Sequence, residues 1–210
     1  MVEVMNASSI RGLLSRRVGV VLGVFIGVGV LGGCGNSMKM DPGAAAAPHN
    51  AADVAFTGRM IAHDQQAVAM AALVENRAGS TRVMDMAKRV QSTHGPQITN
   101  LRAVVAGWGP AASTVTGSHD MSGMSDDGGN SMGVLSPPEL GALANTTATR
   151  FDRMFVVMMT THHTGGMDMA TTELAQGQDA ATKELAASVR AAEAKELAEL
   201  ADILTSLPAS

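Results

Sequence analysis

Apolar residues recur at alternating intervals of three and four in four stretches of the chain. These stretches cover about residues 52–77, 81–106, 148–175 and 180–204. Such a period places apolar side chains along one face of a helix. Gly79 and Gly177 separate the two members of each pair, and glycine commonly follows the end of a helix. The pattern therefore predicts an all-α fold, in which two tandem helical hairpins form a four-helix bundle over residues 51–207.

The second hairpin repeats the first at a spacing of 99 residues, which aligns His63 with His162. Identical residues recur at this spacing in further pairs, among them Asp53 with Asp152, Phe56 with Phe155, Met60 with Met159, and Met70 with Met169. A period of this size does not fit short solenoid repeats. It fits one supersecondary unit that occurs twice, with methionine and histidine among its best-matched positions.

Two features interrupt the helical pattern. Pro96 lies inside the second stretch, so we expect a kink near His94. Residues 111–138 hold many Gly, Ser and Asp residues without a helical period, which predicts a loop that is long for a helix connection. This loop could cross the bundle from end to end or hang from one end. Its histidine and methionines form a second candidate metal contact, namely His119, Met121, Met124 and Met132.

The first 33 residues have the features of a secretory signal. Three arginines precede an apolar run over residues 18–31, which is followed by the Leu-Gly-Gly-Cys sequence that ends at Cys34. This ending resembles the bacterial lipobox, in which the cysteine is lipidated and becomes the new N-terminus. We therefore expect a lipoprotein signal peptide over residues 1–33 and a flexible tether over residues 34–50. An ordinary signal peptide and a membrane anchor are the alternatives.

Acylation of Cys34 would anchor the protein to the cell membrane on its extracytoplasmic face through membrane lipid. Because Cys34 is the single cysteine, no thiolate would remain as a metal ligand or nucleophile. The serines cluster in loops without an arranged His–Asp pair. We therefore expect no enzyme activity and name no catalytic residue.

Composition and charge narrow the range of partners. Aromatic residues make up only 2% of the chain, so a core of Ala, Met, Leu and Val suits helices better than a sheet. The net charge is −4, and removal of residues 1–33, with one Glu and three Arg, makes it −6. Nucleic-acid binding needs a basic face, so nucleic acid is excluded as a partner. The sequence leaves the identity of a protein partner open.

Counting residues from the two hairpin turns predicts a polar layer inside the bundle. His63 precedes Gly79 by 16 residues, and His94 follows it by 15. His162 precedes Gln178 by 16 residues, and Glu193 follows it by 15. In tight antiparallel hairpins these distances bring each pair to one level near the middle of its helices. The layer therefore consists of four side chains: His63, His94, His162 and Glu193.

A metal ion would explain why such a layer lies in an apolar core. A buried polar group without a partner costs about 1–3 kcal/mol, and an unpaired carboxylate costs more. Imidazole suits copper, zinc, nickel and iron, whereas thioether selects Cu(I). We expect four seam methionines to flank the layer, with Met60 and Met159 one turn to one side and Met70 and Met169 about two turns to the other. Copper is therefore favoured over zinc or another transition metal.

The sequence leaves open how the layer is held together and what two neighbouring residues do. The histidines and Glu193 could form a hydrogen-bonded cluster without metal. His163 lies about 100° around the helix from His162, so it could bind metal, face a neighbouring helix or face solvent. Its counterpart Asp64 could bind metal or pair with a nearby arginine.

Two segments resemble the domain of unknown function family 305. They are Asp-x-x-Phe-x-x-x-Met-x-x-His from Asp53 to His63, and FDRMFVVMMTTHHTGGMDMA from Phe151 to Ala170. The resemblance implies an exported bacterial protein with a ferritin-like helical bundle, in a family with members linked to copper binding and copper tolerance. The family pattern has His-His at both sites, whereas this chain has His63-Asp64 at the first. It often has Gln where this chain has His94.

Together these features predict a lipid-anchored, extracytoplasmic metal-binding protein that sequesters copper, supports copper tolerance or delivers the ion. The alternative is a metal-free envelope scaffold or interaction module, for which the bundle and tether would suffice. A di-iron oxidase would need several carboxylates and a Glu-x-x-His motif. The sequence lacks that motif, and we expect only Glu193 to reach the layer.

Overall fold

The computed structural model describes residues 48–109 and 132–209. The predicted signal peptide, Cys34 and most of the tether lie outside the described residues, as do His119, Met121 and Met124. Among the described helices, none is long and apolar enough to cross a membrane.

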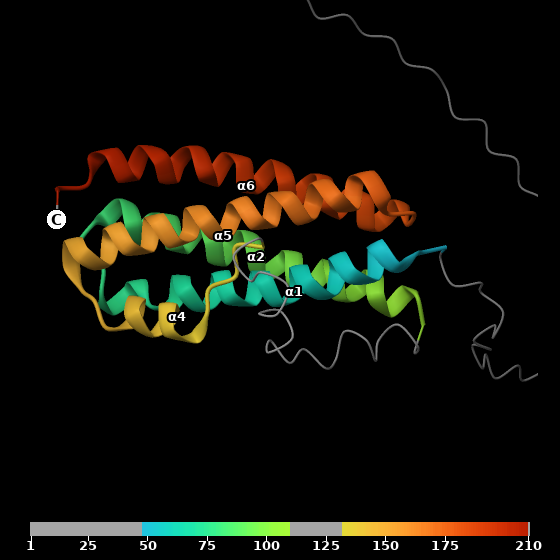
Figure 1. Cartoon of the computed structure of the whole chain (residues 1–210), viewed down its shortest axis with the longest axis horizontal. Helices are drawn as coiled ribbons and strands as arrows, with labels where there is room; N and C mark the ends of the chain where they lie inside the picture. Colours follow the sequence, from blue (N-terminus) through green and yellow to red (C-terminus); the bar gives the residue numbers. More distant parts are fainter. Residues whose placement is uncertain (1–47, 110–131, 210) are drawn as a thin grey trace, which may run out of the picture. The chain divides into compact units, whose positions relative to one another are not determined.

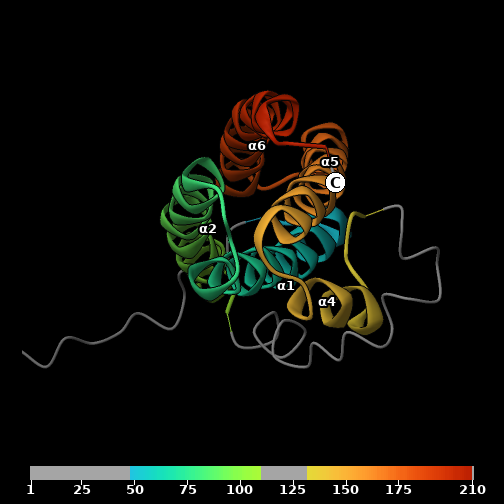
Figure 2. The ribbon, with the colours of Figure 1, turned by 90° about the vertical axis from the view of Figure 1, so that its left-hand side faces the viewer.

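The described residues form helices and contain no strand. In chain order they are α1 (Ala51–Ala72), the 3-10 turn η1 (Val74–Asn76), α2 (Thr81–Gly107), α4 (Pro137–Ala144), α5 (Ala148–Gln176) and α6 (Ala180–Ser206). The helices α1 and α2 form one hairpin, and α5 and α6 form the other (Figure 1). Seen end on, these four helices surround one core, while α4 lies outside it beside α1 and α5 (Figure 2). The predicted four-helix bundle of two hairpins is confirmed.

The two described ends of the long connection lie at opposite ends of the bundle. Trp108, at the end of α2, packs with Val54 near the start of α1. Ala148, at the start of α5, donates its backbone N–H to Arg77 at the opposite end of the bundle. Of the two predicted courses for the loop, the end-to-end crossing is therefore correct. As a consequence α5 is antiparallel to α1.

The end of the first helix differs from the sequence pattern, whereas the second helix agrees with it. The first helix ends at Ala72 rather than near Arg77, because the 3-10 turn η1 tightens the chain before the hairpin turn. The second helix continues through Pro96 to Gly107. Pro96 therefore lies inside the helix, as the sequence pattern predicts.

Two aspartates that are equivalent in the repeat fasten the hairpins to each other. Asp53 on α1 accepts hydrogen bonds from the backbone N–H groups of Gln178 and Asp179, at the turn before α6. Asp152 on α5 accepts one from the N–H of Gly79, at the turn before α2. Each aspartate thus satisfies free donors at the turn of the opposite hairpin, where a negative charge is also favoured by the helix dipole. This reciprocal contact sets the height of one hairpin against the other.

Apolar side chains of the bundle form two main clusters along its length. The first apolar cluster contains Met70, Phe151, Phe155, Met159 and Leu200, with further residues around them. The second contains Phe56, Met60, Leu101, Met169 and Val189 in the same way. On each of the four long helices, the predicted layer residue falls between positions that belong to the two clusters. The core is therefore interrupted by a polar layer.

One buried carboxyl near the Asp53 contact generates a pH prediction. Burial, and then the neighbouring Asp53, raise the pKa of Glu173 from 4.5 to about 8. Between these values the folded protein holds one more proton than the unfolded chain, so this group lowers the free energy of unfolding as pH rises. Glu173→Gln should remove this loss of unfolding free energy with rising pH. Relative to wild type, the variant should therefore become more stable as the pH rises from about 5 to about 8. Urea unfolding at several pH values measures this difference.

The exposed Glu184 provides a control of equal charge. Glu184→Gln should leave the pH profile of the wild type unchanged. If Glu173→Gln also keeps that profile, the carboxyl does not hold its proton in the folded protein.

Candidate metal centre

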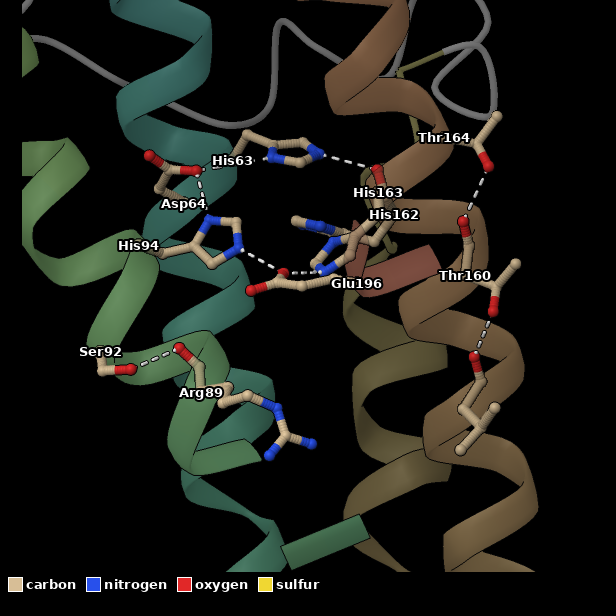
Figure 3. Close-up of polar contacts among 11 residues, drawn as sticks. His63, Asp64, Arg89, Ser92, His94, Thr160, His162, His163, Thr164 and Glu196 are labelled. Carbon is tan, nitrogen blue, oxygen red and sulfur yellow. Dashed lines mark hydrogen bonds and ion pairs between the residues drawn. The ribbon is translucent and has the colours of Figure 1, made fainter. Parts of the chain in front are cut away.

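Four histidines meet in the polar layer between the two apolar clusters. His63 comes from α1, His94 from α2, and His162 and His163 from α5 (Figure 3). All four side chains are fully buried, as is Glu193 from α6. The duplicated helices therefore deliver imidazole and carboxylate groups to one level, as the residue counts predict.

His94 lies at the centre of a hydrogen-bonded chain of ionisable groups. Its Nδ1 is 2.8 Å from Oδ1 of Asp64, and its Nε2 is 3.4 Å from Oε2 of Glu196. The same Glu196 oxygen is 2.7 Å from Nε2 of His163 (Figure 3). Burial alone would lower the pKa of His94, but the two carboxylates outweigh it and raise the pKa to about 10. Burial alone would raise the pKa of Glu196, but its contacts with His163 and His94 outweigh burial and lower the pKa to about 2.

His63 and His162 form a closely packed imidazole pair. Their ring centroids are 3.6 Å apart, and Nε2 of His63 is 3.0 Å from the backbone oxygen of His162. Both ring nitrogens of His162 lack a hydrogen-bond partner within the described residues. Burial, and then the charge that the neighbouring histidines would carry, hold the pKa of His162 well below its ordinary value. His162 is therefore a neutral imidazole with its lone pair available.

Glu193 is the least satisfied group of the layer. Within the described residues neither of its carboxylate oxygens has a hydrogen-bond partner. Burial raises its pKa to about 9, against the opposing effect of His94 and with further raising by Asp64 and Glu196. The space for this carboxylate exists because Gly166 on α5 faces it. A Cβ on Gly166 would overlap with both of the oxygens.

The ligand atoms of the layer fall into two overlapping groups. His94, His163 and Glu193 each offer one atom, and these atoms lie within 4.8 Å of one another. His63, Asp64 and Glu193 likewise each offer one ligand atom, and these atoms also lie within 4.8 Å of one another. We call these the His94 triad and the His63 triad. Mixed imidazole and carboxylate donors suit Cu(II) and Zn²⁺, so the residues present fit a transition metal.

The structure brings most of the sequence-predicted residues together but changes their roles. His63, His94 and Glu193 belong to the triads, whereas His162 packs against His63 and is in neither triad. His163 takes the place expected for His162. Asp64 contacts His94, so of its two open alternatives the pairing with an arginine does not occur among the described residues.

Glu196 is the functional candidate that the sequence pattern missed. It follows Glu193 by three residues and therefore lies one turn further along the same face of α6. That spacing was the available signal. With Asp64, Glu193 and Glu196 present, the layer holds three carboxylates, and the expectation that only Glu193 would reach it is wrong.

The four seam methionines are buried, but their predicted grouping is wrong. Met60 and Met169 belong to the second apolar cluster, and Met70 and Met159 belong to the first. The reason is the antiparallel arrangement of α1 and α5, which places the early part of one helix beside the late part of the other. Each side of the layer therefore has one methionine from each hairpin.

A segment of the long connection covers the layer between α1 and α5. The backbone of Leu135 exchanges two hydrogen bonds with the side-chain amide of Gln66, at 2.9 Å and 2.8 Å. Gly133 has a φ of +69°, and its backbone approaches His162 so closely that a Cβ would overlap with the helix. Gly165 permits the same approach from the side of α5, against the backbone of Met132. Two adjacent glycines on α5 thus serve different neighbours.

Comparisons with known proteins connect this arrangement to one family. The sequence profile of Domain of unknown function (DUF305) matches residues 53–204. No curated protein matches the chain significantly.

Solved structures share the fold. A DUF305 protein of Streptomyces coelicolor, named as secreted, is 24% identical with a TM-score of 0.63 and covers 74% of this chain and 93% of its own. A DUF305 fragment from Deinococcus radiodurans is 22% identical with a TM-score of 0.66, and the coverage is 76% and 99%.

The protein CopM is also similar, in two copper-bound forms. Its Cu(I)-bound form is 19% identical with a TM-score of 0.56, and its Cu(II)-bound form is 21% identical with a TM-score of 0.58. Each covers 73% of this chain and 96% of its own. At these identities the comparison establishes the fold.

The two adjacent glycines of α5 provide a matched pair of substitutions. In Gly166→Ala the added Cβ would contact only the carboxylate end of the flexible Glu193 side chain. Alanine also favours a helix by about 1 kcal/mol over glycine. This variant should remain folded but displace the Glu193 carboxylate, and should bind metal about 10–100-fold more weakly. Gly165→Ala meets backbone and should be destabilised by about 1–3 kcal/mol. Thermal melts and metal titration of both variants separate the two effects; equal metal affinity in Gly166→Ala and wild type would contradict the assigned role of Glu193.

Proposed function

Because the chain belongs to the DUF305 family, we propose that it binds copper in the buried layer and sequesters the ion or hands it on. Its own residues support this function independently of the family. Six ionisable side chains from four helices converge in the layer besides His162, and a transition-metal cation binds both imidazole nitrogens and carboxylate oxygens.

The observation that carries the proposal is the buried carboxylate of Glu193. A buried carboxyl group without a partner is costly when it is ionised, so without a cation Glu193 keeps its proton, in agreement with its raised pKa. Here it faces unpaired imidazole nitrogens across a space that Gly166 leaves open. A bound cation would pair with the carboxylate and use the imidazole lone pairs at the same time. When bound, the cation would supply positive charge and Lewis acidity. The chain would supply buried nitrogen and oxygen donors to hold it.

Copper is favoured over other transition metals by the surroundings of the layer. The triads offer nitrogen and oxygen donors for Cu(II). Two buried methionines on each side, Met60 with Met169 and Met70 with Met159, are the thioether groups that would favour Cu(I). The two copper-bound forms of CopM show that a protein of this fold takes up both oxidation states. Zinc is the competitor to be compared in the same titration.

We propose that the protein acts at the extracytoplasmic face of the cell membrane, anchored by a lipid on Cys34. The motivation is the arginine-led apolar run before the Leu-Gly-Gly-Cys sequence and the similar protein of Streptomyces coelicolor that is named as secreted. The proposed role is to hold the ion rather than to catalyse a reaction. A lipid-tethered bundle would collect copper before it enters the cell.

The metal-free scaffold stays the competing function, because Asp64, His94, Glu196 and His163 already pair with one another. Copper titration separates the two. In wild type, copper at a hundred times its dissociation constant should stabilise the fold by about 2.7 kcal/mol. His94→Ala with His163→Ala should bind at least about tenfold more weakly. His49→Ala, which removes an imidazole stacked on Trp108 outside the layer, is the control and should bind like wild type.

Thermal melts and direct titration with Cu(I), Cu(II) and Zn²⁺ provide the measurements. A melting temperature that copper leaves unchanged in wild type would favour the scaffold and refute metal binding.

The anchor is tested by a separate variant. Cys34→Ala should shift the protein from the membrane fraction to the soluble extracytoplasmic fraction, and should abolish incorporation of labelled fatty acid. Ser37→Ala, a substitution three residues away, should retain both properties. Labelled lipid on the Cys34→Ala variant would contradict the assignment.

A further inference from the structure

We propose that the layer holds two cations that share the carboxylate of Glu193. One cation would lie in the His94 triad and the other in the His63 triad. The proposal rests on the proposed function, since both take the layer to be a metal site, but it adds the stoichiometry and names the bridging group.

Glu193 is the one residue that the two triads have in common. Its two oxygens are both buried and without a hydrogen-bond partner within the described residues. One oxygen can therefore turn to each triad without breaking an existing contact. Carboxylates bridge pairs of cations in two-metal sites, where the ions lie about 3.5–4 Å apart.

A single cation would leave part of the layer unsatisfied. If it occupied the His94 triad, Nδ1 of His63 and Oδ2 of Asp64 would remain buried, and both lack a hydrogen-bond partner in the described parts of the chain. If it occupied the His63 triad, the imidazole of His163 would keep only Glu196 as its partner. Two cations use all five residues of both triads. They also balance the charge of three carboxylates better than one monovalent ion does.

The internal repeat relates individual ligands of the layer to one another. At the spacing of 99 residues, Asp64 corresponds to His163, and the helix positions of His94 and Glu193 are also equivalent. The contact between Asp64 and His94 in the first hairpin is thus repeated as the approach of His163 to Glu193 in the second. Each hairpin contributes an equivalent pair of ligands. The repeat does not exchange the two triads, because Asp64 and His94 belong to different triads whereas their counterparts His163 and Glu193 share one.

Glu196 supports the His94 triad without belonging to it. Its Oε2 lies 2.7 Å from Nε2 of His163 and 3.4 Å from Nε2 of His94, so it holds both rings at one point. A cation at that point could take Glu196 as a further ligand. The two sites would then differ in their number of carboxylates, and hence in affinity.

The test combines copper content with electron paramagnetic resonance of the full chain in detergent. The chain is loaded with Cu(II) without reductant, and bound copper is counted by elemental analysis. Copper at other positions is measured in the His94→Ala, His163→Ala, His63→Ala variant and subtracted. Two ions bridged by Glu193 are magnetically coupled, so the layer should hold two copper ions, show a half-field transition and give fewer spins than copper atoms.

Two substitutions identify the bridge and the second site. Glu193→Gln keeps the size of the side chain but cannot bridge, so coupling should disappear and the full spin count of any remaining copper should return. Asp64→Asn should reduce the layer to one uncoupled ion. Glu173→Gln removes a buried carboxyl that lies outside the layer and should keep two coupled ions. Circular dichroism verifies the fold of each variant, and the coupling in wild type remains a test even if a variant does not fold.

The outcomes separate the two proposals. One copper ion in the layer with a full spin count overturns the shared bridge and leaves the proposed function intact. No difference in copper content between wild type and the triple histidine variant refutes both. Two coupled ions that depend on Glu193 support the inference.

Discussion

The rest of the structure depends on one buried carboxyl group. It lies between the two apolar clusters and has no hydrogen-bond partner among the described residues. Within the described parts of the chain neither carboxyl oxygen of Glu193 has a hydrogen-bond donor, and Gly166 leaves space for the group on α5. Such a group is costly unless it is protonated or paired with a cation. The three imidazoles that share the triads with it offer nitrogen donors that a transition metal takes. The fold and the proposed chemistry therefore depend on the same side chain.

The duplication of the hairpin explains how these groups reach one level. Asp53 and Asp152 each contact the turn of the opposite hairpin, which fixes the height of the two halves. Because the two contacts are equivalent, the middle of every helix meets the middle of the others. The Met132–Leu135 segment then covers the layer between α1 and α5. The result is an enclosed site built by packing that is otherwise apolar.

The sequence predicts the bundle and the height of the layer, because the helical period and the distance from a turn can both be counted along the chain. It does not predict which of two adjacent histidines enters a triad, since α5 has neighbours on several sides and buries both His162 and His163. Glu196 was missed because one residue per helix was assigned to the layer. The methionine pairs were wrong because they depend on the relative direction of α1 and α5. That direction is set by the course of a long connection, which residue counts within a hairpin do not contain.

The most direct measurement is anomalous diffraction at the copper absorption edge, from crystals of the copper-loaded protein. The account predicts copper peaks inside the layer, with an oxygen of Glu193 and the imidazole nitrogens of the triads as ligands. Copper found only outside the layer, with Glu193 still unpaired between the two apolar clusters, would contradict it.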